Sequence, residues 1–255
     1  MDPIDSVFDE DLCVSINLDT IPEVTKTIES IDDPLKKDLI VKYLFTPTNI
    51  ETEITSSEPI SFSSFSNTEF NNCVMEQNAE EASFLLDKIG VLLDIPVDEL
   101  EMEVASIELK GEKVMKEILN PLNDEEVNKI KKFSELKSAA NSYEATFRKK
   151  AKSGYLTILE FEVEMDWQSN NNKITYCDTN SFSYSYVWYW VHYATTTQDP
   201  VVKESYATLT GKKATFREIN RNGYYGAGYY YMIMPTLRLN VDGSYSPTSV
   251  PSVSI

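Results

Sequence analysis

The chain has 255 residues, which is enough for one large domain or two small domains with a sizeable core. Its formal net charge of -18 would be repelled by phosphate backbones, so we expect no nucleic-acid partner. The N-terminal segment MDPIDSVFDEDL is acidic and lacks the basic and apolar regions of a secretory signal. Apolar stretches of about five to ten residues are too short for a membrane helix. We therefore expect a cytoplasmic protein, or one released by a route without such a signal.

Charge and aromatic residues are distributed unevenly along the chain. Residues 1–150 hold 32 acidic and 15 basic side chains, whereas residues 151–255 hold 9 and 8. Of the 15 tyrosines, 13 follow residue 150, as do all 3 tryptophans. This contrast predicts an acidic, mainly helical region over 1–150, an antiparallel β domain over 151–245, and a surface tail over 246–255.

The first part of the chain carries signals for one strand and two helices. Alternating apolar residues predict a strand over 12–18. Apolar residues at spacings of three and four predict helices over 21–31 and 34–45, and Pro34 suits the first turn of the second helix. From 46 to 77 the pattern weakens, and we expect a weakly ordered or irregular region, either a linker or one or two irregular strands. Its three phenylalanines favour ordered, extended structure.

More helices are expected before residue 151. Apolar spacing predicts helices over 78–95, 97–111 and 114–119, each ended by a proline or a glycine. A long helix is then expected over 124–151, because its first turn is acidic and its last turn is basic, as the helix dipole favours.

After Gly154 the pattern changes to a period of two, which is typical of strands. Phe161, Val163, Met165 and Trp167 alternate with acidic residues, and further alternating segments follow between glycine and asparagine breaks. We therefore predict an α+β protein. A helix-rich acidic N-terminal part is followed by an antiparallel, tyrosine-rich β-sheet or sandwich of about six or seven strands.

The sequence contains no recognisable catalytic or cofactor-binding motif. His192, the single histidine, lies in an aromatic segment and is expected to be structural. Cys13, Cys73 and Cys177 are too widely spaced for a zinc site and are expected to be free thiols. We therefore expect a non-enzymatic protein with no catalytic residues, no metal and no cofactor.

Four acidic side chains alternate along one predicted strand: Glu160, Glu162, Glu164 and Asp166. Paired carboxylates can bind calcium or carry out acid–base chemistry. Like charges on one strand face are more typical of a solvated outer face, and we expect that arrangement here.

The run FSYSYVWYWVHY over 182–193 has the most direct bearing on function. We interpret 182–195 as one strand whose even-numbered face, from Phe182 to Trp190, lies in the core. Its odd-numbered face is apolar as well, so it requires cover from the helix over 124–151 or from a partner. Tyrosine and tryptophan are enriched at recognition surfaces. The residues expected to contact a partner are Trp188, Tyr189, Trp190, Tyr193 and Tyr229.

These features favour a recognition or assembly protein whose partner is another protein or a second copy of the chain. The segment ESIDDPLKKDLIVKYLF over 29–45 and the order of the predicted elements resemble the Cyt-type cytolytic toxins of insect-pathogenic bacteria. In that family helices cover a sheet of long strands that reorganises at membranes. The resemblance implies, as the alternative, a membrane-active, pore-forming protein that acts on a membrane surface.

Overall fold

A computed structural model describes residues 21–55, 67–119, 142–196, 198–219 and 225–249. Within these residues, helices are followed by antiparallel strands, so the predicted α+β class is confirmed. The strand predicted over 12–18 lies outside the described residues. The same holds for 124–141 of the predicted long helix and for the last six residues of the predicted tail.

The described helices are α1 (Pro22–Glu29), α2 (Pro34–Phe45), α3 (Asn67–Asp94) and α4 (Val97–Leu119). The first two confirm the helices predicted from apolar spacing. Asp33 caps α2, because its carboxylate accepts hydrogen bonds from the backbone amides of Leu35 (2.9 Å) and Lys36 (3.1 Å).

The other two helices differ from the prediction. α3 begins at Asn67 rather than at 78, so helix occupies the end of the region expected to be extended or irregular. The strand over Asn49–Thr55 agrees with the preference for extended structure. α4 continues through Gly111, where the sequence predicts a break. A Cβ atom at this position would lie 3.0 Å from the carbonyl oxygen of Pro47. The glycine therefore permits close approach of α4 to the chain after α2 rather than ending a helix.

One layer of the β structure is a single antiparallel sheet, here sheet A. Its strands are β1 (Asn49–Thr55), β2 (Ser142–Ser153), β3 (Leu156–Asn170) and β4 (Lys173–Ser185), in that spatial order. The sheet thus includes residues on both sides of the domain boundary that composition predicts near residue 150.

The second layer consists of two smaller antiparallel sheets. Sheet B has the order β5-β8-β9, with β5 (Trp190–Thr196), β8 (Lys213–Ile219) and β9 (Tyr225–Ile233). Sheet C has the order β11-β10-β7-β6, with β6 (Val201–Val202), β7 (Tyr206–Leu209), β10 (Thr236–Asn240) and β11 (Tyr245–Ser249). A hydrogen bond of 2.9 Å from the Met234 amide to the Lys212 carbonyl joins the two sheets.

Apolar side chains and a few polar contacts hold the two layers together. The Trp167 indole donates to the Asn240 carbonyl (3.0 Å), and the Ser169 hydroxyl donates to the Val241 carbonyl (2.6 Å), which ties sheet A to sheet C. Side chains with no exposed surface come from sheet A and from sheet B: Phe161, Val163, Met165, Ala214, Phe216 and Met232. The core is therefore the space between two β layers, as in a sandwich.

Residues 142–151 form part of β2, so the prediction of a helix over these residues is wrong. Ala145, Phe147 and Ala151 alternate on the buried side of the strand. The same segment also has helical spacing, which is why the sequence pattern was ambiguous. Pairing with β1 on one side and β3 on the other decides the outcome, because tertiary contacts override weak helix propensity.

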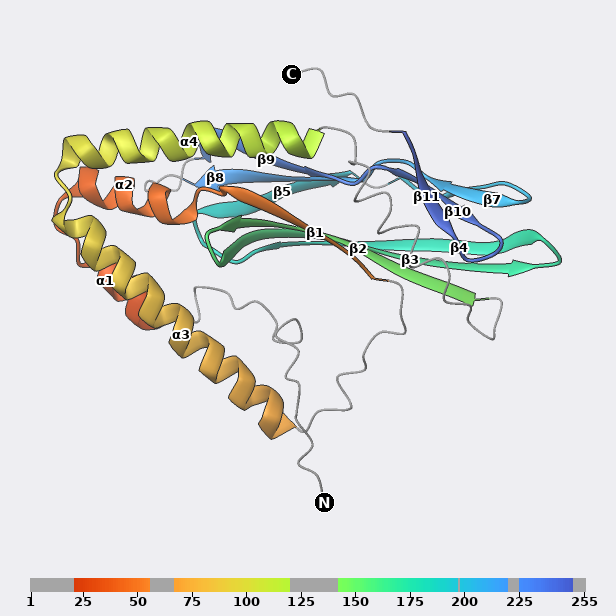
Figure 1. The fold of residues 1–255 in the computed structure, drawn as a ribbon, viewed down its shortest axis with the longest axis horizontal. Coiled ribbons are helices and arrows are strands. Elements are labelled where there is room, and N and C mark those ends of the chain that lie inside the picture. The colour runs from red at the N-terminus through yellow and green to blue at the C-terminus, as the bar shows by residue number, and fades with distance from the viewer. Residues whose placement is uncertain (1–20, 56–66, 120–141, 197, 220–224, 250–255) are drawn as a thin grey trace.

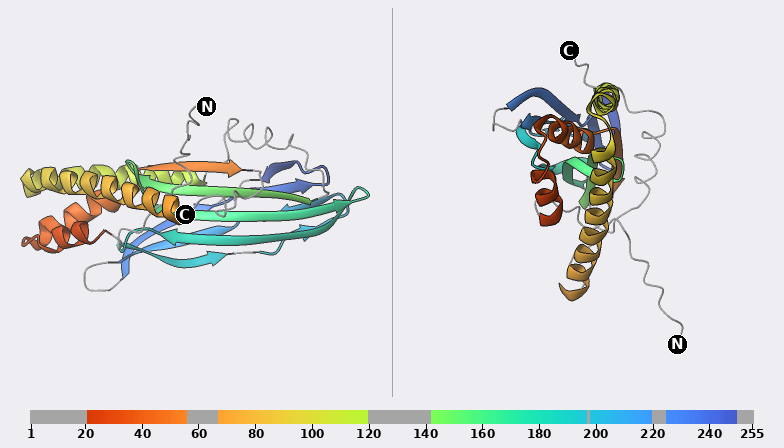
Figure 2. Two further views of the ribbon diagram at one scale, coloured as in Figure 1. Left: turned by 90° about the horizontal axis from the view of Figure 1, so that it is seen from below. Right: turned by 90° about the vertical axis from the view of Figure 1, so that its left-hand side faces the viewer.

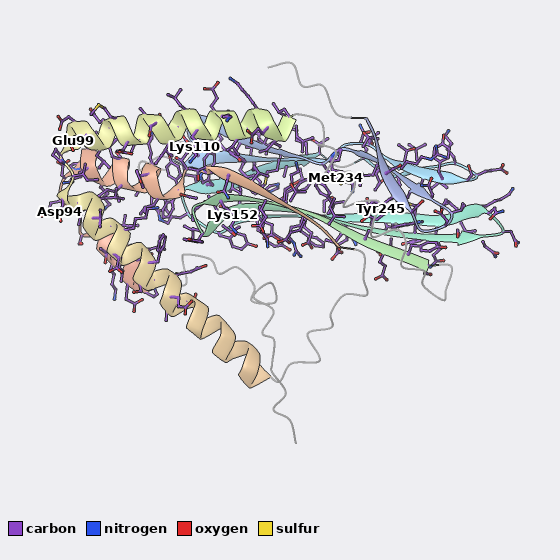
Figure 3. The ribbon with its side chains drawn as sticks, in the orientation of Figure 1. Asp94, Glu99, Lys110, Lys152, Met234 and Tyr245 are labelled. Atoms are coloured by element: carbon purple, nitrogen blue, oxygen red, sulfur yellow. The ribbon has the colours of Figure 1, made fainter. Side chains whose placement is uncertain are left out.

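The helices gather at one end of the molecule, and the strands of sheet A extend away from them (Figures 1 and 2). Figure 3 places Asp94 and Glu99 at this helical end and Tyr245 on the β structure beyond it. α4 packs along β9, and an ion pair of 2.9 Å between Lys42 and Glu108 joins it to α2. In the described part of the chain, none of the helices combines the length and apolarity that crossing a membrane requires.

Candidate functional site

The aromatic run over 182–193 is divided between two sheets, so the prediction of one strand over 182–195 is wrong. β4 ends at Ser185 and β5 begins at Trp190, with a turn between them. The Ser185 hydroxyl lies within hydrogen-bonding distance of the carbonyl oxygens of Val187 (2.9 Å) and Trp190 (2.8 Å) and holds the turn closed. The first half of the run therefore belongs to sheet A and the second half to sheet B.

The even-numbered side chains before this turn lie on the outer face of sheet A. Phe182 and Tyr184 are exposed, and their rings stack with centroids 6.4 Å apart; Tyr186 continues the stack 6.2 Å from Tyr184. The prediction that this face is core is therefore wrong for Phe182 and Tyr184. The inward positions of β4 are taken by Thr179 and Ser181, whose hydroxyls contact a lysine amine in the interior.

Three of the predicted contact residues pack against the end of α2. The rings of Trp188 and Tyr189 lie 6.2 and 6.5 Å from that of Phe45, and the Trp190 indole donates a hydrogen bond of 2.8 Å to the Phe45 carbonyl. Trp190 is only 5% exposed. The Tyr189 hydroxyl bonds to Glu218, and burial together with this carboxylate raises the pKa of Tyr189. α2 thus covers these side chains, whereas the sequence predicts cover from the helix over 124–151 or from a partner.

The other two predicted residues, Tyr193 and Tyr229, meet on the outer face of sheet B. Their rings lie 6.1 Å apart, and the Arg217 guanidinium lies 5.8 Å from the Tyr193 ring and 5.2 Å from the Tyr229 ring. Tyr231 stacks on Tyr229 at 6.2 Å, and the Lys213 amine lies 4.1 Å from the Tyr231 ring. We call these five residues the tyrosine–arginine face.

Strand pairing explains why these side chains converge. β8 is the central strand of sheet B, and Arg217 pairs directly with Tyr229, while Thr215 pairs with Tyr231. The register between β5 and β8 shifts between His192 and Ala194, which is where Tyr193 lies. Cation–π contacts at partly exposed positions contribute about 0.5–1 kcal/mol each. The face is therefore an ordered group of aromatic and cationic side chains.

His192 has contacts that agree with a structural role. Its Nε2 atom lies 2.7 Å from the Thr195 hydroxyl, and its ring packs edge-on against Phe216 with centroids 5.9 Å apart. The hydroxyl of Thr195 also lies 3.1 Å from that of Ser183 on β4. These bonds tie β5 to the end of sheet A.

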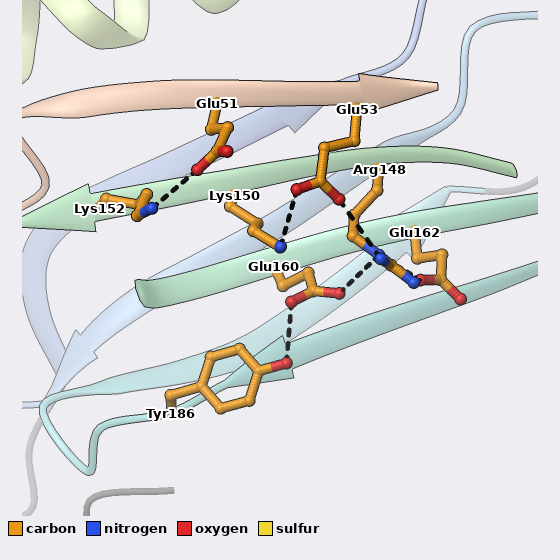
Figure 4. Close-up of polar contacts among 8 residues, drawn as sticks. All are labelled: Glu51, Glu53, Arg148, Lys150, Lys152, Glu160, Glu162 and Tyr186. Atoms are coloured by element: carbon orange, nitrogen blue, oxygen red, sulfur yellow. Dashed lines mark hydrogen bonds and ion pairs between the residues drawn. The ribbon is translucent and has the colours of Figure 1, made fainter. Parts of the chain in front are cut away.

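The outer face of sheet A carries a network of ion pairs centred on Arg148 (Figure 4). The Arg148 guanidinium contacts Glu53 on β1 at 3.3 Å and Glu160 on β3 at 3.1 Å. Its Nε atom also donates to Glu162 at 2.6 Å. The Tyr186 hydroxyl donates to the remaining oxygen of Glu160 at 2.9 Å. One guanidinium therefore bridges carboxylates from both neighbouring strands.

The expectation of a solvated acidic face is wrong for Glu160 and Glu162. Glu160 is 6% exposed and Glu162 9% exposed, because the side chains of β2 and of the turn after β4 cover them. Burial raises the pKa of Glu160, and Tyr186 and Arg148 counteract this effect. The sequence pattern does not predict the burial of Glu160 and Glu162, because Arg148 lies in the segment over 124–151 that the pattern assigns to a helix.

In the described part of the chain, no three His, Cys, Asp or Glu side chains are placed so that they could hold a metal ion. Burial raises the pKa of the Cys177 thiol to about 11, which disfavours the thiolate. Lys212, which the sequence analysis missed, is 1% exposed; its amine bonds to the hydroxyls of Thr179 and Ser181. This lysine joins the two β layers at a place that solvent does not reach.

A comparison of the chain with protein-family models, curated proteins and solved structures finds no match.

Proposed function

We propose that this chain is a non-enzymatic recognition or assembly protein that binds an acidic protein surface through the tyrosine–arginine face. The observation that carries this proposal is the Arg217 guanidinium packed against the rings of both Tyr193 and Tyr229, 5.8 and 5.2 Å from their centroids. Tyr193 is 58% exposed, so a partner can reach the ring directly. Tyrosine and arginine are the residue types that most often dominate binding energy at protein interfaces.

Charge favours an acidic partner. Lys213 and Arg217 supply two cations to this face, in a chain whose formal net charge is -18. Stacked rings lose little conformational freedom on binding, so they supply contact area at low entropic cost. A second copy of the chain is the first candidate, since α4 (Val97–Leu119) carries acidic side chains from Asp98 to Glu117 that outnumber its lysines.

A photo-cross-linking residue at Val191, which pairs with Arg217 across β5 and β8, tests this proposal. We expect a specific protein adduct, either with the purified chain alone or in an extract of the source cells. Unlabelled wild type should compete for the adduct, while a Tyr193→Ala/Arg217→Ala competitor should be at least about tenfold weaker, as expected for loss of two central contacts.

Arg238→Ala is the matched control competitor. Arg238 lies 4.1 Å from the Tyr206 ring on sheet C, so this variant removes a similar cation–π pair elsewhere on the surface. It should compete as well as wild type. Equal competition by the Tyr193→Ala/Arg217→Ala variant, or the absence of a competable adduct under both conditions, would argue against the proposed contact surface.

Exposed apolar side chains on the helices favour a second candidate, a membrane-active protein. These side chains belong to α2, α3 and α4: Leu35, Phe84, Val91, Leu93, Met102 and Leu109. Large exposed apolar patches mark protein or membrane contact sites. In this function the helical end would meet the lipid surface first.

Dye release from vesicles of phosphatidylcholine and phosphatidylglycerol tests the membrane candidate. If the helical end contacts lipid, Val91→Glu/Met102→Glu should reduce release about tenfold or more, because buried charge in the lipid interface is costly. The matched control Val201→Glu/Val202→Glu alters exposed apolar residues on β6 and should leave release unchanged. A wild type that releases no dye from either lipid would remove this candidate.

A further inference from the structure

A pocket of about 320 Å³ lies where α4 packs along sheet B. Met115 of α4, Trp190 of β5, and Tyr229 and Tyr230 of β9 contribute its apolar and aromatic walls. The Thr46–Pro47 segment after α2 closes another side. Ligand sites in proteins begin at about this size, and the volume corresponds to roughly ten water molecules. The pocket therefore suits a small molecule, and Tyr229 is the one residue that belongs both to its lining and to the tyrosine–arginine face.

Three carboxylates line this pocket: Glu108, Glu112 and Glu218. Lys42 pairs with Glu108 at 2.9 Å, and Lys116 pairs with Glu112 at 2.9 Å. Two lysines thus face three carboxylates, which leaves an excess of one negative charge among these five side chains.

Of these three carboxylates, Glu218 is the one whose charge the two lysines compensate least. It bonds to the Tyr189 hydroxyl, and Lys42, the cation that acts on it, is already paired with Glu108. Its side chain packs against Gly228, where an added Cβ would lie 2.6 Å from the Glu218 carboxyl carbon. The glycine on β9 therefore leaves the space that this carboxylate occupies.

A second observation points to a ligand in the same pocket. Tyr230 is 2% exposed, yet its hydroxyl has no hydrogen-bond partner among the described residues. A buried hydroxyl without a partner is unfavourable in a folded protein, and such groups require an explanation. The Tyr230 ring lies 6.0 Å from that of Trp190, which itself pairs across the strands with Glu218. Tyr230 and Glu218 both line the pocket.

We propose that this pocket binds a small organic cation, a primary ammonium group carried on a short apolar or aromatic body. The ammonium donates hydrogen bonds to the Glu218 carboxylate and to the Tyr230 hydroxyl oxygen. The apolar body packs against Trp190 and Met115, and the aromatic rings favour the cation electrostatically. A bare metal ion fits less well, since the described residues contain no convergent group of three metal-ligating side chains.

Titration calorimetry with phenethylamine tests this proposal, with phenethyl alcohol as the uncharged probe of similar shape. We expect saturable binding of the amine at one site and at least about tenfold weaker binding of the alcohol, because a charged hydrogen bond is lost. Glu218→Gln should weaken amine binding by a similar factor. Tyr230→Phe, which removes only the hydroxyl, should weaken it about threefold to tenfold.

Tyr245→Phe is the matched control, because Tyr245 on sheet C also has a buried hydroxyl without a partner among the described residues. This variant should bind the amine as wild type does. Gly228→Ala keeps every charge but displaces the Glu218 carboxyl, so it should also weaken binding. Thermal unfolding of each variant establishes that it is folded. Equal affinity for amine and alcohol, or unchanged amine binding by folded Glu218→Gln and Tyr230→Phe, would overturn the proposal.

Discussion

Arg148→Ala should lower the free energy of unfolding at pH 7 by about 2–4 kcal/mol, as expected when one partner of a largely buried ion pair is removed. The guanidinium is the shared partner of Glu53, Glu160 and Glu162, and the last two carboxylates are nearly inaccessible to water. Without Arg148, they would repel each other across neighbouring positions of β3. Urea unfolding followed by circular dichroism measures the difference.

The loss caused by Arg148→Ala should depend on pH in a defined direction. Burial raises the pKa of Glu160 above its ordinary value of 4.5, and Arg148 counteracts this effect, so removing the arginine raises that pKa further. A carboxyl whose pKa is raised by folding stabilises the protein below its unfolded pKa, and this stabilisation is lost as the pH rises through its folded pKa. The deficit of the variant should therefore be largest at neutral pH and shrink as the pH falls through the raised pKa of Glu160, which lies above 4.5.

Lys173→Ala is the matched control for this experiment. Lys173 pairs with Glu204 at 2.6 Å, but both side chains are largely exposed. Exposed ion pairs contribute about 0–1 kcal/mol, so this variant should unfold close to wild type. A deficit for Arg148→Ala no larger than that of the control, or one that does not decrease in acid, would contradict the role of the buried network.

The sequence predicts those parts of the fold whose pattern is local. α2 is an example: Asp33 and Pro34 mark its start, and both signals depend only on neighbouring residues. The period of two after Gly154 likewise predicts β3. The error at 142–151 has a different origin, because its outcome depends on β1, nearly 100 residues earlier in the chain. Residue spacing does not show which distant strand supplies the partner.

The same distinction applies to the candidate surface. Tyr193 and Tyr229 are identifiable from composition, and Arg217 alternates with buried Ala214 and Phe216 in a pattern that was present in the sequence. Their meeting depends on the strand order β5-β8-β9, which brings residues far apart in the chain onto neighbouring strands. The turn after Ser185 has no strong signal of its own, since it contains neither glycine nor proline. Long-range pairing therefore decides which aromatic residues are exposed.

Trp190→Ala tests most directly whether the aromatic run over 182–193 is divided into a buried part that includes Trp190 and an exposed part that includes Tyr193. The indole is buried between α2 and sheet B, contacts the Tyr189 and Tyr230 rings, and donates to the Phe45 carbonyl. Truncation of such a side chain leaves a cavity and costs about 3–5 kcal/mol of unfolding free energy. The sequence analysis places Trp190 both on the predicted core face and among the expected contact residues. In the contact role the variant would lose a partner but keep its stability.

Two further variants separate the contributions of Trp190. Trp190→Phe keeps most of the ring volume but leaves the Phe45 carbonyl without its donor, so it should cost about 1–3 kcal/mol. Tyr193→Ala, three residues later, should cost only about 1 kcal/mol or less, because its ring is exposed and the variant loses mainly a surface cation–π contact. If Trp190→Ala were as stable as Tyr193→Ala, the indole could not be part of the packed contact with α2. The boundary between core and recognition surface would then have to lie before Trp190, rather than between Trp190 and Tyr193.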